Sequence, residues 1–395
     1  MVPRVLEVMH GHLASWEKDG KVPMFRAARL MGVDLGMDVI MQVQLPEDVD
    51  RQWAKSQVEV FLDGLYALPV SLPGTALRKA IAARDRLVRI FEPGVQQRHA
   101  EFQKQWASVG GSIQAYADMV LEQPSRQATT RPSSDGAAAA PPAAPGPKPS
   151  IMAAQLMGRA AIDQCVLKDA AMSVCHMLVA AADTTRFALF NTWSLLAMSP
   201  RVQDRLYEEQ QKVIAQYGPE LSYQATCHMP YMDATLKECM RLLPASAGGI
   251  RKLTRDLRVG QYVIPKGEHV WFHAGLLHCT DPALWDGRTD YQHGLPPHMD
   301  WRHNFDDAFR PERWLGGEEG RPRYHFTFGT GAHLCIGMNL VYLEIKLLLA
   351  MVLRKYRIRL ECPDMLARCG RLFPFLVPEK GTDNVLLEAR EGLAA

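Results

Sequence analysis

The sequence has no excess of charge of one sign and no long apolar run. Its 45 Lys and Arg residues nearly balance its 43 Asp and Glu residues, and the net charge of +2 argues against a dedicated nucleic-acid binder. No window reaches the roughly 18 apolar residues that a spanning helix needs, and the N-terminus lacks an apolar core of the signal-peptide kind. We therefore expect the chain as given to be soluble, with no nucleic acid among its partners.

Paired cysteines are also missing. The eight cysteines show no regular spacing, and none forms a C-x-x-C or C-x-x-H pair, so the ligand spacing of a zinc site is absent. In a chain of 395 residues they are typical of reduced, mostly buried thiols. This cysteine usage favours a reducing compartment over secretion.

Large apolar side chains are absent from residues 126–150, RQATTRPSSDGAAAAPPAAPGPKPS. A segment made of Ala, Pro, Gly, Ser and Thr cannot bury enough surface to offset the entropy lost on ordering. It predicts a disordered, low-complexity insertion. We interpret the whole of residues 1–395 as one domain that carries this insertion, because no internal repeat is present.

Elsewhere the periodicity predicts a mainly α fold with a minor β part. We expect helices throughout residues 1–122, and the alternating stretch 257–272 predicts a hairpin. The Pro-, Gly-, Trp- and His-rich stretch 281–323 has little periodicity and predicts a long coil. The clearest helical patterns occupy residues 48–68, 73–92, 163–200, 201–218 and 338–356.

One cysteine lies in a glycine-rich stretch, FTFGTGAHLCIG, at residues 326–337. A thiolate can be a nucleophile, a redox thiol or a metal ligand. As a nucleophile Cys335 would need a base, for which His333 is the only local candidate, and as a redox thiol it would lack a resolving partner. A structural buried cysteine is the remaining alternative.

A metal-ligand role explains the neighbours of Cys335 best. A helix that begins near residue 338 would place the sulfur at a positive helix end. Gly331 and Gly337 would let the backbone turn tightly and approach a flat ligand, and Phe328 would shield the sulfur from water. A planar macrocycle with one axial thiolate, haem, fits this pattern.

The pattern F-x-x-G-x-x-x-C-x-G resembles the haem-binding loop of the cytochrome P-450 superfamily, the haem-thiolate monooxygenases. The resemblance implies that haem b lies between a long central helix and the helix after the Cys loop. It also implies that Cys335 is the axial ligand of the haem iron, and that Phe328, Gly331 and Gly337 contribute to cofactor binding.

Two further motifs occur in the order of that family. KECMR carries E-x-x-R as Glu238 and Arg241, and RPERW carries Arg313. Residues three apart share a helix face, but most such pairs are solvated surface pairs. The resemblance implies instead that the three residues form a buried structural triad, which holds the coil before the haem loop and takes no part in catalysis.

The stretch AADTTR, residues 181–186, resembles the oxygen-binding segment of the family's central helix. The resemblance implies catalytic roles for Thr184, whose hydroxyl would bond to bound oxygen, and for Asp183 as a proton-relay acid. A helix-interior Thr that bonds back to a carbonyl is the alternative. The family's glycine is replaced by Ala181, so we expect a smaller local distortion of the helix.

Cationic side chains are expected beside the haem propionates. Arg251 falls where the family places such a cation, and a bidentate guanidinium suits a carboxylate. His333 stands where many members have Arg, and a solvent-facing loop histidine is its alternative. Lys252 and His278 are further candidates for this role.

The stretch 64–87 resembles the group that acts on sterols, brassinosteroids, abscisic acid and retinoids. The resemblance implies a monooxygenase that inserts one atom of O2 into an apolar sterol- or terpenoid-like substrate. Electrons would come from NADPH-cytochrome P-450 reductase. We expect a monomer, and for the full-length protein a place on the cytosolic face of the endoplasmic reticulum membrane.

The family's anchor helix and first strands have no counterpart in this sequence, which predicts an N-terminally truncated domain. Membrane association is therefore expected of the full-length protein only. Two alternatives remain open. One is a haem-thiolate isomerase or dehydratase, although such enzymes do not need Thr184, and the other is a haem-binding fragment without turnover.

Overall fold

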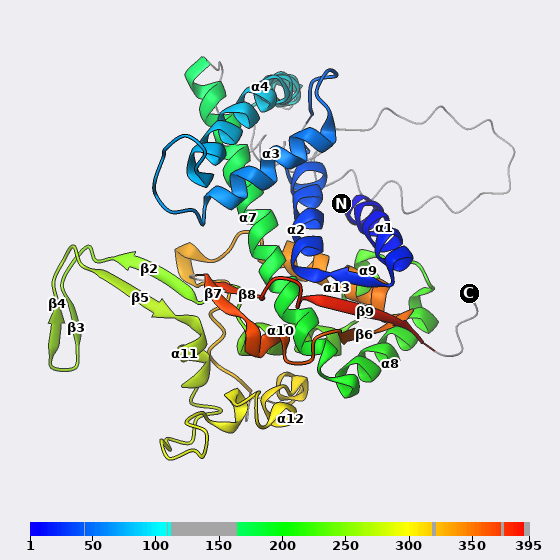
Figure 1. The fold of residues 1–395 in the computed structure, drawn as a ribbon, viewed down its shortest axis with the longest axis vertical. Coiled ribbons are helices and arrows are strands. Elements are labelled where there is room, and N and C mark those ends of the chain that lie inside the picture. The colour runs from blue at the N-terminus through cyan, green and yellow to red at the C-terminus, as the bar shows by residue number, and fades with distance from the viewer. Residues whose placement is uncertain (43, 109, 112–163, 318–320, 373–374, 391–395) are drawn as a thin grey trace, which may run out of the picture. The chain divides into compact units, whose positions relative to one another are not determined.

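The computed structural model divides the described chain into two compact units (Figure 1). One unit comprises Met1–Gly32 and Ala181–Ala395, and the other comprises Val33–Ala180. The predicted insertion at 126–150 lies outside the described residues, and the assignment to a single domain stays a prediction. The structure describes residues 1–42, 44–108, 110–111, 164–317, 321–372 and 375–390.

Two helices that pack against each other form about half of the described part of the unit Val33–Ala180. These are α3 (Arg51–Gly64) and α4 (Ala76–Ser108), which confirm the predicted helices at 48–68 and 73–92. α4 continues beyond the predicted end and contains Pro93. A π-helical turn, η1 (Gly36–Ile40), precedes α3.

The other unit is mainly helical, which confirms the predicted fold class. The long apolar pattern at 163–200 forms α7, and the charged pattern at 201–218 forms α8, which begins at Pro200 and is capped by Gly218. The unit includes parts of α2 and α7, both of which continue into the other unit. The helices are α1 (Val2–Asp19), α2 (Met24–Leu35), α7 (Gln164–Ala197), α8 (Pro200–Tyr217), α9 (Tyr223–Thr226), α10 (Pro230–Leu242), α11 (Ala274–Cys279), α12 (Phe305–Ala308) and α13 (Met338–Leu353).

The strands form small antiparallel sheets, and one of them corrects the prediction for residues 1–122. The short strand β1 lies between two helices and pairs with β9 near the C-terminus; three residues are too few to show an alternating pattern. The strands are β1 (Lys21–Pro23), β2 (Gly248–Lys252), β3 (Leu257–Val259), β4 (Tyr262–Ile264), β5 (His269–His273), β6 (Tyr356–Leu360), β7 (Gly370–Leu372), β8 (Phe375–Val377) and β9 (Asn384–Ala389). Their order is β1-β9-β6, β2-β5, β3-β4 and β7-β8.

The predicted hairpin at 257–272 is only partly confirmed. β3 and β4 form a tight hairpin across Gly260, which has a positive φ of 58°. β5 pairs instead with β2, earlier in the chain. The alternating pattern could not predict this, because alternation indicates a strand but not its partner. Figure 1 shows the β3-β4 hairpin extending from the β2-β5 ribbon.

The long coil predicted at 281–323 is interrupted by single helical turns. These are η2 (Pro297–Met299), α12 and η3 (Pro311–Trp314). The chain then continues through the short turn η4 (Gly331–His333) into α13, which confirms the helix predicted from residue 338. A last 3-10 turn, η5 (Met365–Arg368), precedes β7.

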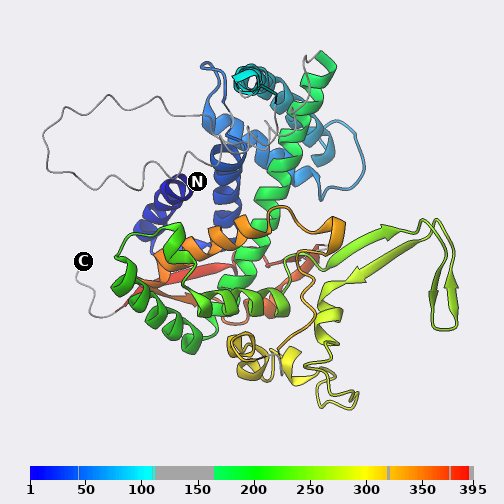
Figure 2. The same cartoon turned by 180° about the vertical axis from the view of Figure 1, so that it is seen from behind.

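The core of this unit surrounds α7 and α13. Residues 182–196 of α7 are buried with one exception, and residues 344–353 of α13 are buried except for Lys346. Figure 2 shows α13 running beside α8, α9 and α10, which it contacts. None of the described helices is both long and apolar enough to span a membrane.

Gly32 of α2 allows a close approach to the central helix. A Cβ added at Gly32 would lie 2.9 Å from Cα and 3.0 Å from the carbonyl oxygen of Ala182, and neither backbone atom can rotate away. We expect Gly32→Ala to lower the free energy of unfolding by about 1–3 kcal/mol, measured by urea denaturation.

Gly11→Ala is the matched control, because Gly11 is a helical glycine in α1 with nothing within 4 Å of an added Cβ. That substitution should stabilise the protein by up to about 1 kcal/mol through helix propensity. Equal effects of the two substitutions would contradict the close approach of α2 and α7.

Candidate functional site

The Cys loop is a compact turn that presents Cys335 immediately before α13. The N–H of Cys335 donates to the carbonyl of Phe328 at 2.8 Å, and the N–H of Met338 donates to the carbonyl of Cys335 at 3.3 Å. Gly337 is the N-cap of α13, so the thiol lies beside the positive end of the helix. Cys335 is exposed, and the structure therefore does not support the alternative of a structural buried cysteine.

The glycines of this loop act in two different ways. Gly331 has φ +61°, and Gly329, which the sequence analysis did not single out, has φ +74°. These two positions make the tight turn. Gly337 lies in the turn that the N–H of Met338 closes on the carbonyl of Cys335, but its φ of −85° is one that any residue can adopt, so this turn does not require glycine. A Cβ there would lie 3.8 Å from the Cys335 sulfur, so Gly337 keeps the space beside the thiol open.

Apolar side chains flank the thiol. Leu334 and Ile336 are 49% and 89% exposed, and Ile336 is the most exposed of the large apolar side chains described. The Phe328 ring packs against Tyr342 of α13, with centroids 5.4 Å apart. The loop therefore offers one thiol within an apolar surface, which suits a flat apolar ligand bound through sulfur.

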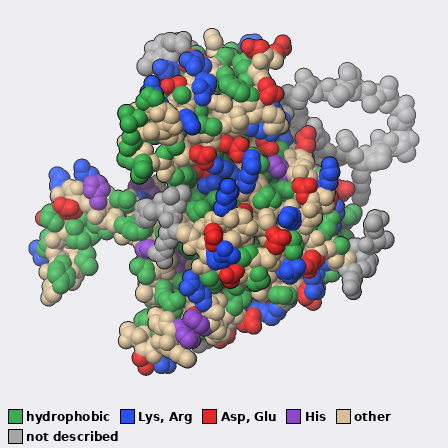
Figure 3. Space-filling view, viewed as in Figure 1, with side chains coloured by type: hydrophobic (Ala, Val, Ile, Leu, Met, Phe, Trp, Pro, Cys, Tyr) green, Lys and Arg blue, Asp and Glu red, His purple; other side chains and the backbone are tan. Residues whose placement is uncertain are grey.

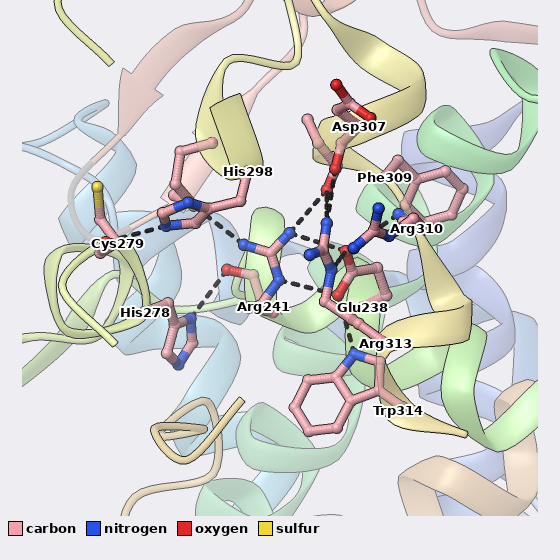
Figure 4. A network of polar contacts seen from close by, with 12 residues as sticks. Glu238, Arg241, His278, Cys279, His298, Asp307, Phe309, Arg310, Arg313 and Trp314 are labelled. Carbon is pink, nitrogen blue, oxygen red and sulfur yellow. Dashed lines mark hydrogen bonds and ion pairs between the residues drawn. The ribbon is translucent and has the colours of Figure 1, made fainter. Parts of the chain in front are cut away.

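The E-x-x-R helix forms a fully buried ion-pair cluster (Figure 4). Glu238 and Arg241 of α10 have no exposed surface, and Arg241 donates to both Glu238 oxygens at 2.8 Å. Arg313 of η3 donates to Glu238 Oε1 at 2.8 Å. The three residues predicted to form a triad are thus brought together, and the geometry is unlike that of a surface pair.

Sequence reasoning missed two further donors to the same carboxylate. The indole of Trp314 donates to Glu238 Oε2 at 2.8 Å, and the N–H of Arg310 donates to Oε1 at 3.1 Å. Burial alone would raise the pKa of Glu238, but the guanidiniums of Arg241 and Arg313 outweigh it and lower the pKa to about 2. The carboxylate is therefore ionised at neutral pH and joins α10 to the coil after α12.

A second set of contacts joins α10 to the Cys loop. His278 of α11 is fully buried; its Nδ1–H donates to the carbonyl of Arg241 at 2.8 Å, and its Nε2 accepts from the N–H of Phe326 at 2.9 Å. Burial lowers the pKa of His278 to about 4, so the ring is neutral and can use both nitrogens in this way. Thr327 adds a hydroxyl bond to the carbonyl of Met240 at 2.9 Å.

His278 was a candidate for a propionate contact, and its two nitrogens are instead used by main-chain groups. No local sequence motif predicts this structural role of His278, because Arg241 and Phe326 lie far from it in the sequence. Asp281 acts nearby in the same way: it is fully buried, and its Oδ2 accepts from the N–H groups of Arg323, at 2.6 Å, and Tyr324. These contacts hold residues 323–326, which lead into the Cys loop.

Thr184 is the single exposed residue among residues 182–196 of the central helix. Its neighbour Asp183 is 2% exposed and turned toward two guanidiniums, with Arg29 Nε at 3.4 Å and Arg186 Nη2 at 3.3 Å. Arg186 lies over the rings of Phe25 and Phe187, 4.4 and 4.5 Å from their centroids. The two neighbouring residues thus differ in setting: Thr184 is exposed, whereas the Asp183 carboxylate lies in a buried ionic cluster.

The two predicted propionate cations lie in different settings. Arg251 of β2 donates to the carbonyl of Ile250 at 2.9 Å and covers the ring of Phe272, 5.2 Å from its centroid. Among the described residues no carboxylate pairs with Arg251, so its charge is available to an anion. His333 is exposed on η4, and Lys252 is exposed at the end of β2.

These contacts describe a mainly helical protein in which one loop, held by a buried ionic cluster, presents a thiol at a helix N-terminus. The sequence profile of the cytochrome P450 family matches residues 1–291 and 306–382. The chain belongs to the cytochrome P450 family, and membership implies a haem cofactor.

Relatives and solved structures agree with this assignment. The chain is 32% identical to the mitochondrial 1,25-dihydroxyvitamin D(3) 24-hydroxylase of Mus musculus over 199 residues, covering 50% of this chain and 34% of that protein. It is 24% identical to putative cytochrome P450 120 of Synechocystis over 359 residues, covering 90% and 66%. Retinoic acid-bound cyanobacterial CYP120A1 has the same fold, with a TM-score of 0.67 at 22% identity, covering 98% of this chain and 74% of that one.

The chain spans about a third of the length of the mouse protein and about two thirds of the length of the Synechocystis protein.

The residues around Cys335 fit the implied haem. The soft thiolate is a known axial ligand of haem iron, the flanking surface is apolar, and Gly337 leaves room at the sulfur.

We expect Glu238→Ala to destabilise the protein by about 3–5 kcal/mol, because it leaves two buried guanidiniums without a counter-charge. Glu388→Ala is the matched control, since its ion pair with Arg359 is about half exposed on both sides. That change should cost about 1 kcal/mol or less. Chemical denaturation of both variants tests the difference, and similar losses would show that the buried cluster is not special.

Glu344 of α13 makes stability depend on pH. It is 3% exposed, its Oε1 has no hydrogen-bond partner among the described residues, and burial raises its pKa from 4.5 to about 8. The folded state therefore keeps a proton that the unfolded chain loses as the pH rises above 4.5. Stability should fall by about 1.4 kcal/mol per pH unit across this interval from this group alone.

Glu344→Gln removes the titration, so we expect the variant to lose less stability than the parent between about pH 5 and about pH 8. Glu208→Gln, a change at an exposed glutamate of α8, should keep the slope of the parent. Urea denaturation of the parent and both variants at each pH measures this loss of stability. A slope that Glu344→Gln leaves unchanged would show that the carboxyl is solvated.

Proposed function

We propose that this chain is the haem-bearing part of a monooxygenase that inserts one oxygen atom from O2 into an apolar, sterol- or terpenoid-like substrate. The observation that carries the proposal is the exposed thiol of Cys335, held by the Phe328 carbonyl at the N-terminus of α13. Haem with an axial thiolate supplies oxygen activation and O–O cleavage. The other steps belong to the side chains around it.

Cys335 would bind the iron through sulfur, with haem b as the cofactor. The thiol lies at the N-terminus of α13, between the apolar side chains of Leu334 and Ile336. Phe328 would cover the proximal side of the loop from its position against Tyr342. Gly331 shapes the turn and Gly337 leaves space at the sulfur, while Arg251 and His333 would bind the propionates.

Thr184 and Asp183 would handle protons on the opposite side of the cofactor. The exposed hydroxyl of Thr184 can donate to, and accept from, a bound ligand or water. Asp183 can serve as the relay acid only by exchanging its contacts with Arg29 and Arg186 for a water or the Thr184 hydroxyl. Those two ion pairs therefore oppose proton transfer by Asp183.

Glu238, Arg241 and Arg313 would have a structural role only. Their cluster is fully or nearly fully buried, and all of its contacts go to protein groups. Its effect on activity would therefore pass through the position of the Cys loop. The exposed Thr184 favours the monooxygenase over a haem-thiolate isomerase or dehydratase, which would need no hydroxyl there.

The substrate class rests on relatives. The mouse protein is named a vitamin D hydroxylase, and the structurally similar cyanobacterial protein is described as bound to retinoic acid. Both names support an apolar isoprenoid-like substrate. We propose NADPH-cytochrome P-450 reductase as the electron donor, a monomeric state, and for the full-length protein a place on the cytosolic face of the endoplasmic reticulum membrane.

Cys335→Ala should abolish thiolate ligation. After haem loading, the ferrous protein with carbon monoxide should show the strongly red-shifted Soret band of thiolate-ligated haem, and the variant should lose it. Cys227→Ala, which removes another exposed free thiol, is the matched control and should keep the band. With the reductase and NADPH, hydroxylation of a retinoid or sterol panel should fall at least about 100-fold in Cys335→Ala only.

A Soret band that Cys335→Ala leaves unchanged would refute the assigned ligand. A normal band without hydroxylation of any panel member would refute the proposed substrate class. Absence of haem uptake by the parent protein would refute a catalytic role for this chain by itself.

A further inference from the structure

Three potential metal ligands converge in the coil between α11 and α12. His293, Asp300 and His303 each offer a ligand atom, and these atoms all lie within 4.8 Å of one another. The imidazole rings of His293 and His303 stack with centroids 3.6 Å apart, and His303 Nδ1 is 2.8 Å from Asp300 Oδ1. Figure 3 shows histidine side chains gathered on the surface in the region of α12.

This cluster lies in a stretch of the chain that the family does not account for. The family profile matches residues 1–291 and then resumes at residue 306. All three side chains belong to residues 292–305, between the matched parts. The cluster is therefore a feature of this chain and does not follow from family membership.

The backbone beneath the cluster is firmly held. Asp300 is 6% exposed; its N–H donates to the carbonyl of Pro296 at 3.1 Å, and its carbonyl accepts from the N–H of Asn304 at 2.9 Å. Gly294, with φ +70°, makes the turn between His293 and the rest of the segment. One ligand is thus a buried carboxylate in a fixed position, and the other two are exposed imidazoles that can rotate toward it.

The same stretch is joined to the ionic cluster of α10 (Figure 4). His298 is 7% exposed, and its Nε2–H donates to the carbonyl of Cys279 at 3.0 Å. The sulfur of Met299 accepts from Arg241 Nη1 at 3.2 Å. His298 and Met299 lie between His293 and Asp300 in the sequence. A metal bound to His293 and Asp300 would therefore hold the part of the segment that makes these two buried contacts.

We propose that His293, Asp300 and His303 form a Zn²⁺ site that stabilises this segment against the Glu238–Arg241–Arg313 cluster. Two imidazoles and a carboxylate are borderline donors that suit Zn²⁺, whereas Mg²⁺ and Ca²⁺ prefer sites made of oxygen ligands. Metal–ligand distances of about 2.0–2.2 Å place tetrahedral donors roughly 3.3–3.5 Å apart, which small rotations of the exposed imidazoles can reach. Water would complete the coordination.

The ion would bind between His303 Nδ1 and Asp300 Oδ1, which lie 2.8 Å apart. Asp307, beyond the segment, accepts a hydrogen bond from Asn304 at 2.7 Å.

Zinc binding to the haem-loaded protein tests the proposal. After treatment with a chelator, titration calorimetry with zinc sulfate should show one equivalent bound per chain at neutral pH. His293→Ala and His303→Ala should each weaken this binding at least about tenfold, and the double variant should lose it. Zinc should raise the thermal midpoint of the parent but not of the double variant, and magnesium should raise neither.

His10→Ala is the matched control, because His10 is an exposed histidine of α1 outside the cluster, and it should bind zinc as the parent does. His293→Gln keeps a polar side chain at an exposed position and serves if an alanine variant misfolds; its haem spectrum checks the fold. Zinc binding that is absent from the parent would overturn the proposal. So would binding that the double variant retains, which would place the ion on other histidines or on thiols.

Discussion

The carboxylate of Glu238 receives five hydrogen bonds in a place with no exposed surface. Two come from Arg241, and one each comes from Arg313, from the indole of Trp314 and from the N–H of Arg310, all between 2.8 and 3.1 Å. Ionised groups this deeply buried are stable only when their lone pairs and protons are satisfied. The pairing therefore requires α10, η3 and the intervening coil to keep one arrangement.

The Cys loop depends on that arrangement through main-chain groups. The carbonyls of Met240 and Arg241, at the end of α10, bond to Thr327 and to His278, and His278 in turn accepts from Phe326. Two residues later, the Phe328 carbonyl accepts the N–H of Cys335. A few short contacts thus connect the buried carboxylate to the residue that bears the thiol. This explains how a coil with little regular structure can place a ligand accurately.

Local patterns in the sequence predicted what is determined locally. The apolar period of α7, the charged face of α8 and the helix after the Cys loop depend on neighbours a few residues apart, and all three are present. Partners far apart in the chain were not predictable in this way. β1 pairs with β9 from the other end of the chain, and His278 has ordinary sequence neighbours. The Cys-loop glycines show the same limit, because a motif gives their positions but not which ones need a positive φ.

The segment 292–305 lies at the surface but reaches the buried cluster through Met299. Arg241 uses Nε and Nη2 for Glu238 and for the carbonyl of Ala308, at 2.8 and 2.7 Å. Its Nη1 donates to the sulfur of Met299, which comes from the segment itself. Without the segment, a guanidinium with no exposed surface would lose that acceptor, and an unsatisfied donor in such a place costs about 1–3 kcal/mol. Sulfur is a weak acceptor, so the contact holds only while the segment stays closed. Ligands on either side of Met299 would supply that closure, which gives a physical reason for a metal at this point of the chain.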